Sequence, residues 1–123
     1  MKIRPERVAH LMQREIADIL RTRMRDPRLS EWVSVTDVVV TEDLSVAKVF
    51  VSILPTGEER ERALAALEGA AGFVRHELAP RLGLRELPEI RFKLDTSIEH
   101  GARVEELLKR LERGESVPDE DLE

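Results

Sequence analysis

The chain has 123 residues, of which 41% are hydrophobic and 37% are charged, with no cysteine and a formal net charge of −5. This composition predicts one globular domain with a buried core, and it excludes disulfides and thiolate metal sites. Because the amino terminus lacks the apolar stretch of a signal peptide and no apolar run is long enough to cross a bilayer, we expect a cytoplasmic protein without a membrane segment.

The first predicted element is an amphipathic helix over residues 4–24, with apolar residues at the three- and four-residue spacing of a helix. Asp26-Pro27 ends it, because a residue before proline avoids the helical conformation. Four arginines fall within about 40° of one another on this helix, nearly opposite the apolar side: Arg7, Arg14, Arg21 and Arg25. This arginine stripe is either a solvated exterior or a surface for phosphate, which the planar guanidinium binds with two hydrogen bonds.

Two segments rich in β-branched residues follow, at residues 32–40 and 45–54, and they predict a hairpin joined by residues 41–44. One face of the second segment is wholly apolar, with Ala47, Val49, Val51 and Ile53, whereas the other face mixes apolar and polar side chains. We therefore expect the sheet to bury one face and to leave the other partly in water.

A long helical pattern over residues 58–82 contains the sequence Gly69-Ala70-Ala71-Gly72. Each glycine inside a helix costs about 1 kcal/mol relative to alanine, so this segment predicts a kink between two helices. The first amides of the second helix would then be free to bind an anion such as phosphate. Alternatively, the glycines only let the two helices pack closely. Phe73, like Phe92 further on, occupies an apolar position and is expected in the core.

The last third of the chain predicts a strand at residues 88–94, in which apolar residues alternate with Arg91 and Lys93. These charges suit protection of an edge strand, contact with phosphate, or both. Residues 96–99 fit a capping box, which begins a last helix that ends at Gly114. Three strands with one apolar face, covered by helices, predict a two-layer α+β domain over residues 1–110, and residues 111–123 predict an acidic, disordered tail.

Charge is distributed unevenly along the chain. The net charge of the tail equals that of the whole chain, because the tail contains six acids and one basic residue, Arg113. The acids are Glu112, Glu115, Asp119, Glu120, Asp121 and Glu123. Positive charge gathers in residues 1–31 and 75–93, which is compatible with a local phosphate-binding face. The tail either screens the protein from promiscuous nucleic-acid binding or only keeps it soluble.

The sequence shows no catalytic or metal-binding motif. The histidines His10, His76 and His100 lack metal-binding spacing, and neither a nucleophile elbow nor a phosphate-binding glycine loop is present. Aromatic residues are also scarce, which argues against readout of RNA sequence by stacking of bases. We expect a protein without enzymatic activity, cofactor or small-molecule substrate.

Several motifs then occur in a characteristic order: Arg14-Glu15-Ile16-Ala17-Asp18-Ile19-Leu20, Asp26-Pro27-Arg28-Leu29, Asp43-Leu44-Ser45-Val46-Ala47-Lys48, Ala70-Ala71-Gly72-Phe73-Val74-Arg75 and Asp95-Thr96-Ser97-Ile98-Glu99. This series, over residues 4–108, resembles the ribosome-binding factor A family. The resemblance implies a type II KH-like fold with a three-stranded sheet, in the order α-β-β-α-kink-α-β plus a carboxyl-terminal helix. It also implies a bacterial assembly factor that binds the small ribosomal subunit and its 16S rRNA, assists late maturation and 5′-end processing of that RNA, and supports growth in the cold.

The resemblance also suggests where RNA binds. KH domains clamp the nucleic-acid backbone with a GxxG loop, and the family has an Ala-x-Gly kink in its place, here Ala70-Ala71-Gly72. Because these alanines offer only methyl groups and backbone, we expect the kink mainly to set the angle between two helices. The candidate RNA-binding residues are Arg7, Arg14, Arg21, Arg25, Arg28, Ala70, Ala71, Gly72, Arg75, Arg81, Arg85, Arg91 and Lys93. The alternative function is a protein-interaction adaptor that uses the apolar sheet surface or the acidic tail. A small domain with a charged exterior favours a monomer.

Overall fold

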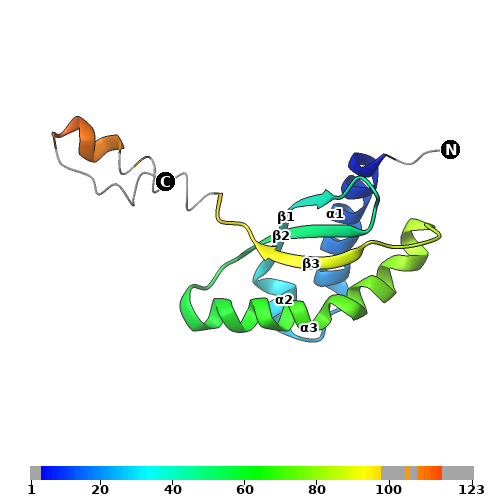
Figure 1. Cartoon of the computed structure of the whole chain (residues 1–123). Coiled ribbons are helices and arrows are strands. Elements are labelled where there is room, and N and C mark those ends of the chain that lie inside the picture. The colour runs from blue at the N-terminus through cyan, green and yellow to red at the C-terminus, as the bar shows by residue number, and fades with distance from the viewer. Residues whose placement is uncertain (1–3, 98–104, 106–107, 115–123) are drawn as a thin grey trace.

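The structure is a computed structural model that describes residues 4–97, 105 and 108–114. Its elements, shown in Figure 1, are α1 (Pro5–Thr22), α2 (Pro27–Glu31), β1 (Val33–Val40), β2 (Val46–Ile53), α3 (Gly57–Leu82) and β3 (Glu89–Leu94). The strands form one sheet in the order β1-β2-β3, in which β1 and β2 are antiparallel and β2 and β3 are parallel. The helices cover one face of this sheet, as expected for a two-layer α+β domain.

The sheet buries the face that the sequence predicts. Ala47, Val49 and Val51 of β2 are completely buried, whereas Lys48 between them is exposed. Val49 lies between Val38 of β1 and Phe92 of β3 in the strand register. Because successive side chains of a strand point to opposite faces, this register aligns the apolar residues of all three strands on one side.

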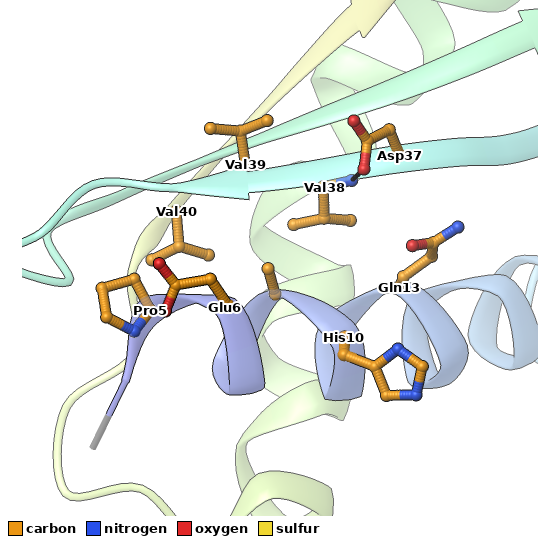
Figure 2. Close-up of a pocket in the computed structure, with 9 residues that line it drawn as sticks. Pro5, Glu6, His10, Gln13, Asp37, Val38, Val39 and Val40 are labelled. Carbon is orange, nitrogen blue, oxygen red and sulfur yellow. Dashed lines mark hydrogen bonds between the residues drawn. The ribbon is translucent and has the colours of Figure 1, made fainter.

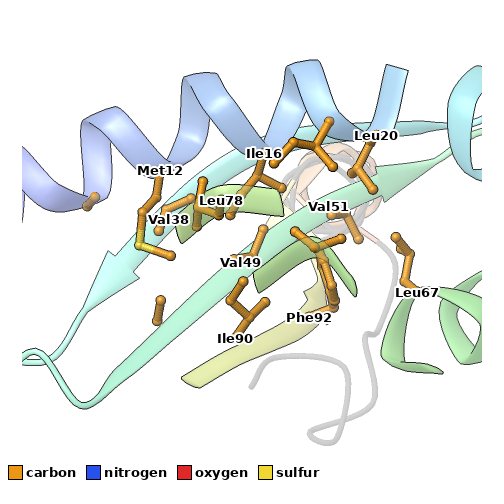
Figure 3. Packing of buried hydrophobic residues seen from close by; sticks show 14 of the residues in the cluster. Met12, Ile16, Leu20, Val38, Val49, Val51, Leu67, Leu78, Ile90 and Phe92 are labelled. Carbon is orange, nitrogen blue, oxygen red and sulfur yellow. The ribbon is translucent and has the colours of Figure 1, made fainter. Parts of the chain in front are cut away.

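The helices fill the space above that apolar face. Figure 3 shows Met12, Ile16 and Leu20 of α1 packed over the strands, with Leu67 and Leu78 contributed by α3. All five side chains are at most 2% exposed. Burial of one such side chain stabilises a fold by about 1.5–3 kcal/mol, so both helices are held mainly by their apolar stripes.

The parallel pairing of β2 and β3 determines the place of α3. Parallel neighbours require a crossover connection, and α3 carries the chain from the end of β2 to the loop before β3. Its buried residues are Ala63, Leu67, Val74 and Leu78. They recur at four- and seven-residue spacing, so one continuous stripe of α3 packs against the sheet and α1.

The predicted break in this helix is wrong. α3 is one helix of 26 residues that runs through Gly69 and Gly72 without interruption, although Figure 1 shows its axis changing direction along its length. The buried stripe lies on both sides of the glycines, and its packing outweighs the roughly 2 kcal/mol that two glycines cost a helix. A helix interior has no free amides, so this segment does not contain the helix start that was expected to attract phosphate.

Three smaller expectations also need correction. α1 ends at Thr22, which leaves Arg25 in a loop outside the arginine stripe. The short helix α2 was not expected, although Asp26 accepts a hydrogen bond from the amide of Arg28 and Pro27 occupies the first turn, both typical of a helix start. Phe73 is 44% exposed rather than buried, whereas Phe92 is 4% exposed and lies in the core as expected.

The predicted carboxyl-terminal helix can be compared with the structure only at its two ends. The carboxylate of Asp95 accepts a hydrogen bond from the amide of Ser97. Residues 108–112 are helical, and Gly114 follows with a φ of 80°, a conformation that favours glycine after a helix. The capping-box residue Glu99 and most of the acidic tail lie outside the described residues.

We predict that replacement of Gly69 or Gly72 by alanine stabilises the protein by about 1 kcal/mol for each site. Both residues are inside α3, and a Cβ atom built on either would meet no atom within 4 Å. Urea unfolding of the two variants measures the effect. Destabilisation by either alanine would contradict a continuous helix and would support a kink that requires glycine.

Candidate nucleic-acid interface

The predicted RNA-binding residues lie on two sides of the domain. We call the solvent-facing surface of α1, α2, α3 and their loops the helical side, and the uncovered face of β1, β2 and β3 the outer sheet face. Most of the predicted residues belong to the helical side. Arg91 and Lys93 belong to the outer sheet face, where Arg91 is the strand partner of Lys48. Arg91 also donates a hydrogen bond to Glu89 over 3.1 Å.

The arginine stripe consists of three residues in the structure. Arg7, Arg14 and Arg21 are all exposed on α1. Arg14 lies 3.7 Å from Glu15, and Arg21 donates to Asp18 over 2.9 Å, with both guanidiniums about three-quarters exposed. Exposed ion pairs of this kind contribute little to stability, so a phosphate can replace the carboxylate at small cost. This stripe therefore keeps the properties of an anion-binding surface.

A hollow of about 520 Å³ opens beside this stripe, where α1 meets α2 and the start of β1. Arg14 and Arg21 line it from α1, and Ser30 and Ser34 line it from the other side. Two guanidiniums and two hydroxyls supply donors for phosphate and sugar oxygens, although the acids Asp18 and Glu31 also line this hollow and balance the charge of the two arginines. The hollow thus brings two of the predicted arginines together with polar residues that the sequence did not single out.

Arg81 has a structural role in the free protein. Its guanidinium reaches from α3 to α1, where it donates to Asp18 over 2.7 Å and to Glu15 over 3.1 Å. Hydrogen bonds from Arg81, and then from Arg21, lower the pKa of the Asp18 carboxyl. This contact joins two helices that are far apart in sequence, and it occupies the Nη1 group of Arg81.

Two further predicted arginines are also occupied internally. Arg28 donates three hydrogen bonds to the Asp26 carboxylate, which lowers the pKa of that carboxyl and fixes the start of α2. Arg75 donates to the backbone carbonyls of Leu87 and Pro88, over 2.8 and 3.3 Å, and so anchors the loop before β3. Arg7, Arg25, Arg85 and Lys93, by contrast, have no ion pair within the part of the chain that the structure describes.

The family's Ala-x-Gly segment is only partly accessible. Ala70 and Ala71 are half-buried against the core, and Gly72 alone is exposed. Gly72 lines a hollow of about 740 Å³ between α3 and the loop before β3, together with Arg75, His76 and Arg85. This hollow places three of the predicted residues in one basic site.

The next hollow along α3, of about 600 Å³, contains residues that sequence reasoning missed. These are Arg23 and the exposed Phe73, which line the hollow together with the predicted Arg25, and Arg23 donates to Glu77 over 3.0 Å. A helical wheel gives the signal that could have found Phe73, because this residue lies about 100° from its buried neighbour Val74. An aromatic ring beside arginines is typical of nucleic-acid surfaces.

A different kind of hollow lies between the start of α1 and the edge strand β1. Figure 2 shows Val38 and Val40 pointing toward α1 and Val39 pointing away from it. Glu6 and Asp37 contribute acids to this hollow of about 370 Å³, and none of its lining residues is lysine or arginine. An acidic site of this kind repels phosphate. It therefore lies outside the candidate nucleic-acid interface.

The described residues contain no group of three or more metal-ligating side chains that could hold an ion. Among the same residues, no helix combines the length and hydropathy needed to cross a membrane.

Comparisons with known proteins agree on one family. The family model described as "Ribosome-binding factor A" matches residues 4–108. Ribosome-binding factor A of Desulforamulus reducens is 43% identical over 118 residues, which are 96% of this chain and 98% of that protein. The crystal structure of ribosome-binding factor A from Thermus thermophilus matches with a TM-score of 0.65 and 28% identity, over 75% of this chain and 97% of that one.

A second matching structure places a ribosome-binding factor A in its complex with the 30S subunit. It is a homology model of the Thermus thermophilus factor fitted into a cryo-electron microscopy map of its complex with the 30S subunit. The match has a TM-score of 0.58 and 30% identity, and it covers 72% of this chain and 96% of that one. The fold is therefore the type II KH-like fold that the family resemblance implies.

We predict that replacement of Arg81 by methionine lowers stability at neutral pH. The pKa of Asp18 is below its ordinary value of 3.8 in the folded protein, so its pairing stabilises the fold above that pH and is lost as the pH falls through the lower folded value. The difference between parent and variant in urea unfolding should therefore shrink as the pH is lowered below 3.8.

Arg62 provides a matched control for this experiment. It pairs with Glu58 over 3.5 Å at an exposed position of α3, so its replacement by methionine should change stability little at either pH. Equal effects of the two substitutions at neutral pH would contradict the structural role of Arg81.

Proposed function

We propose that this chain, which belongs to the ribosome-binding factor A family, binds the small ribosomal subunit through its helical side and assists late maturation of that subunit. The factor contacts 16S rRNA as a folded surface and performs no chemical step itself. Family membership and the fitted complex of the Thermus thermophilus factor with the 30S subunit support this role. The family resemblance further suggests action in the cytoplasm, help with 5′-end processing of 16S rRNA, and support of growth in the cold.

The arrangement of cations on the helical side is the observation that carries the proposed surface. Arg14 and Arg21 line one hollow, Arg23 and Arg25 a second, and Arg75 and Arg85 a third. The second and third hollows are formed by α3 with the loop after α1 and with the loop before β3, and the first also includes the start of β1. Separate hollows that each contain two arginines suit a folded RNA, whose phosphates lie at several positions in space rather than along one extended strand.

The outer sheet face offers a weaker case for RNA binding. Its cations are Lys48, Arg91 and Lys93, and Glu89 already pairs with Arg91. None of these residues lines the hollows described above. The proposed surface therefore excludes this face, and Arg91 and Lys93 serve mainly to protect the edge strand β3 from pairing with other strands.

We predict that reversal of Arg14 and Arg21 to glutamate weakens binding to purified small subunits. RNA binding by arginine releases counterions, so affinity decreases as the salt concentration rises. The magnitude of the slope of log affinity against log salt should therefore decrease by about one for each phosphate contact that is lost. The dissociation constant is measured by co-sedimentation at several salt concentrations, with circular dichroism to verify that the helices are intact.

Reversal of Lys48 to glutamate is the control for charge alone, because this lysine is exposed on the outer sheet face, which the proposed surface excludes. An unchanged dissociation constant for the variant at Arg14 and Arg21 would remove the arginine stripe from the interface. Binding that does not respond to salt would instead favour the protein-interaction adaptor.

A further inference from the structure

Phe73 is an exposed aromatic residue on α3, a helix on which no other large apolar side chain is exposed. It is 44% exposed, whereas Leu67, Val74 and Leu78 of the same helix are fully buried. Trp32 and Phe50 are half-buried and Phe92 is buried, so Phe73 is the one exposed aromatic side chain within the described residues. Its position is not explained by packing of the core.

The surroundings of Phe73 combine an apolar surface with positive charge. It lines a hollow of about 600 Å³ with Arg23, Met24 and Arg25, a size in the range of sites that hold small organic groups. Glu77 is the only acid of this hollow, and its carboxylate is already paired with Arg23 at 3.0 Å. Arg25 has no ion pair among the described residues, so the hollow carries a free cation.

We propose that Phe73 is a stacking platform for one unpaired nucleotide of the bound RNA, with Arg25 in contact with its phosphate. An exposed aromatic ring, a hollow beside it and an unpaired arginine are the features by which proteins bind unpaired bases, since every base has a π-face and carries a phosphate. An apolar protein side chain would use the ring but would leave Arg25 without a partner. This proposal rests on the proposed function. It adds the chemical class of the ligand, an unpaired nucleotide, that one hollow of the proposed surface binds.

The test compares replacements of Phe73 by alanine, leucine and tryptophan for binding to purified small subunits. Alanine removes the ring, leucine keeps apolar volume without a π-face, and tryptophan keeps the π-face. Alanine and leucine should weaken binding by about fivefold to about 100-fold, as for loss of one stacked base, whereas tryptophan should retain it. Replacement of Leu54 by alanine is the control, because Leu54 is 78% exposed and lies outside this hollow.

A second readout uses the single tryptophan of the chain, Trp32. In a variant with phenylalanine at position 32 and tryptophan at position 73, a single-stranded oligoribonucleotide of mixed sequence should quench the fluorescence of the new tryptophan. A fully paired RNA of the same length should quench it much less, because its bases are not free to stack.

Each outcome decides the proposal. Normal binding by both the alanine and leucine variants would overturn it while leaving the proposed function intact, provided that the parent protein binds the subunit. Normal binding by leucine with loss by alanine would assign Phe73 to an apolar contact with protein and would also overturn it. Failure of the parent protein itself to bind would contradict the proposed function instead.

Discussion

Burial of one face of a three-stranded sheet is the constraint on which the rest of this structure depends. A sheet of this size has no partner sheet, so its apolar face must be covered by helices. The stripes of α1 and α3 meet this need, with Met12, Ile16, Leu67 and Leu78 all completely buried. Once these stripes face inward, the arginines on the opposite side of α1 face solvent. The same packing that stabilises the core therefore presents the cations that suit RNA.

This constraint also explains the glycines of α3. The helix must reach from β2 to β3 to allow their parallel pairing, and its buried stripe continues on both sides of Gly69 and Gly72. Packing therefore keeps the helix intact, and the glycines serve neither a break nor a close contact, since no atom lies within 4 Å of a Cβ built at either position. What they provide is exposed helix backbone without side chains, which at Gly72 lines the hollow that contains Arg75.

Much of the fold could be predicted from the sequence, because apolar periodicity and strand alternation are local signals. The hairpin, the buried face of β2 and the order of the three strands are examples. The continuity of α3 could not be predicted in this way, because the local helix propensity of the two glycines favoured a break. The packing of the apolar stripe of α3 outweighs that propensity, and this packing exists only in the folded chain. In the same manner, the arginine stripe follows from helix geometry, whereas the internal partners of Arg81, Arg28 and Arg75 depend on contacts that only the folded chain reveals. Phe73 was misplaced because its apolar character was given more weight than its angle on the helix.

The central claim is that the helical side, and not the outer sheet face, lies against 16S rRNA. The absence of cysteine from the sequence makes a direct test possible. One cysteine is introduced at Ala79, which is exposed beside Gly72 and Arg75, and in a separate variant at Lys48, which is exposed on the outer sheet face. Each is coupled to an iron chelate that generates hydroxyl radicals on the assembled complex with the small subunit. We predict strong cleavage of 16S rRNA from position 79 and weak cleavage from position 48; strong cleavage from position 48 alone would contradict the account.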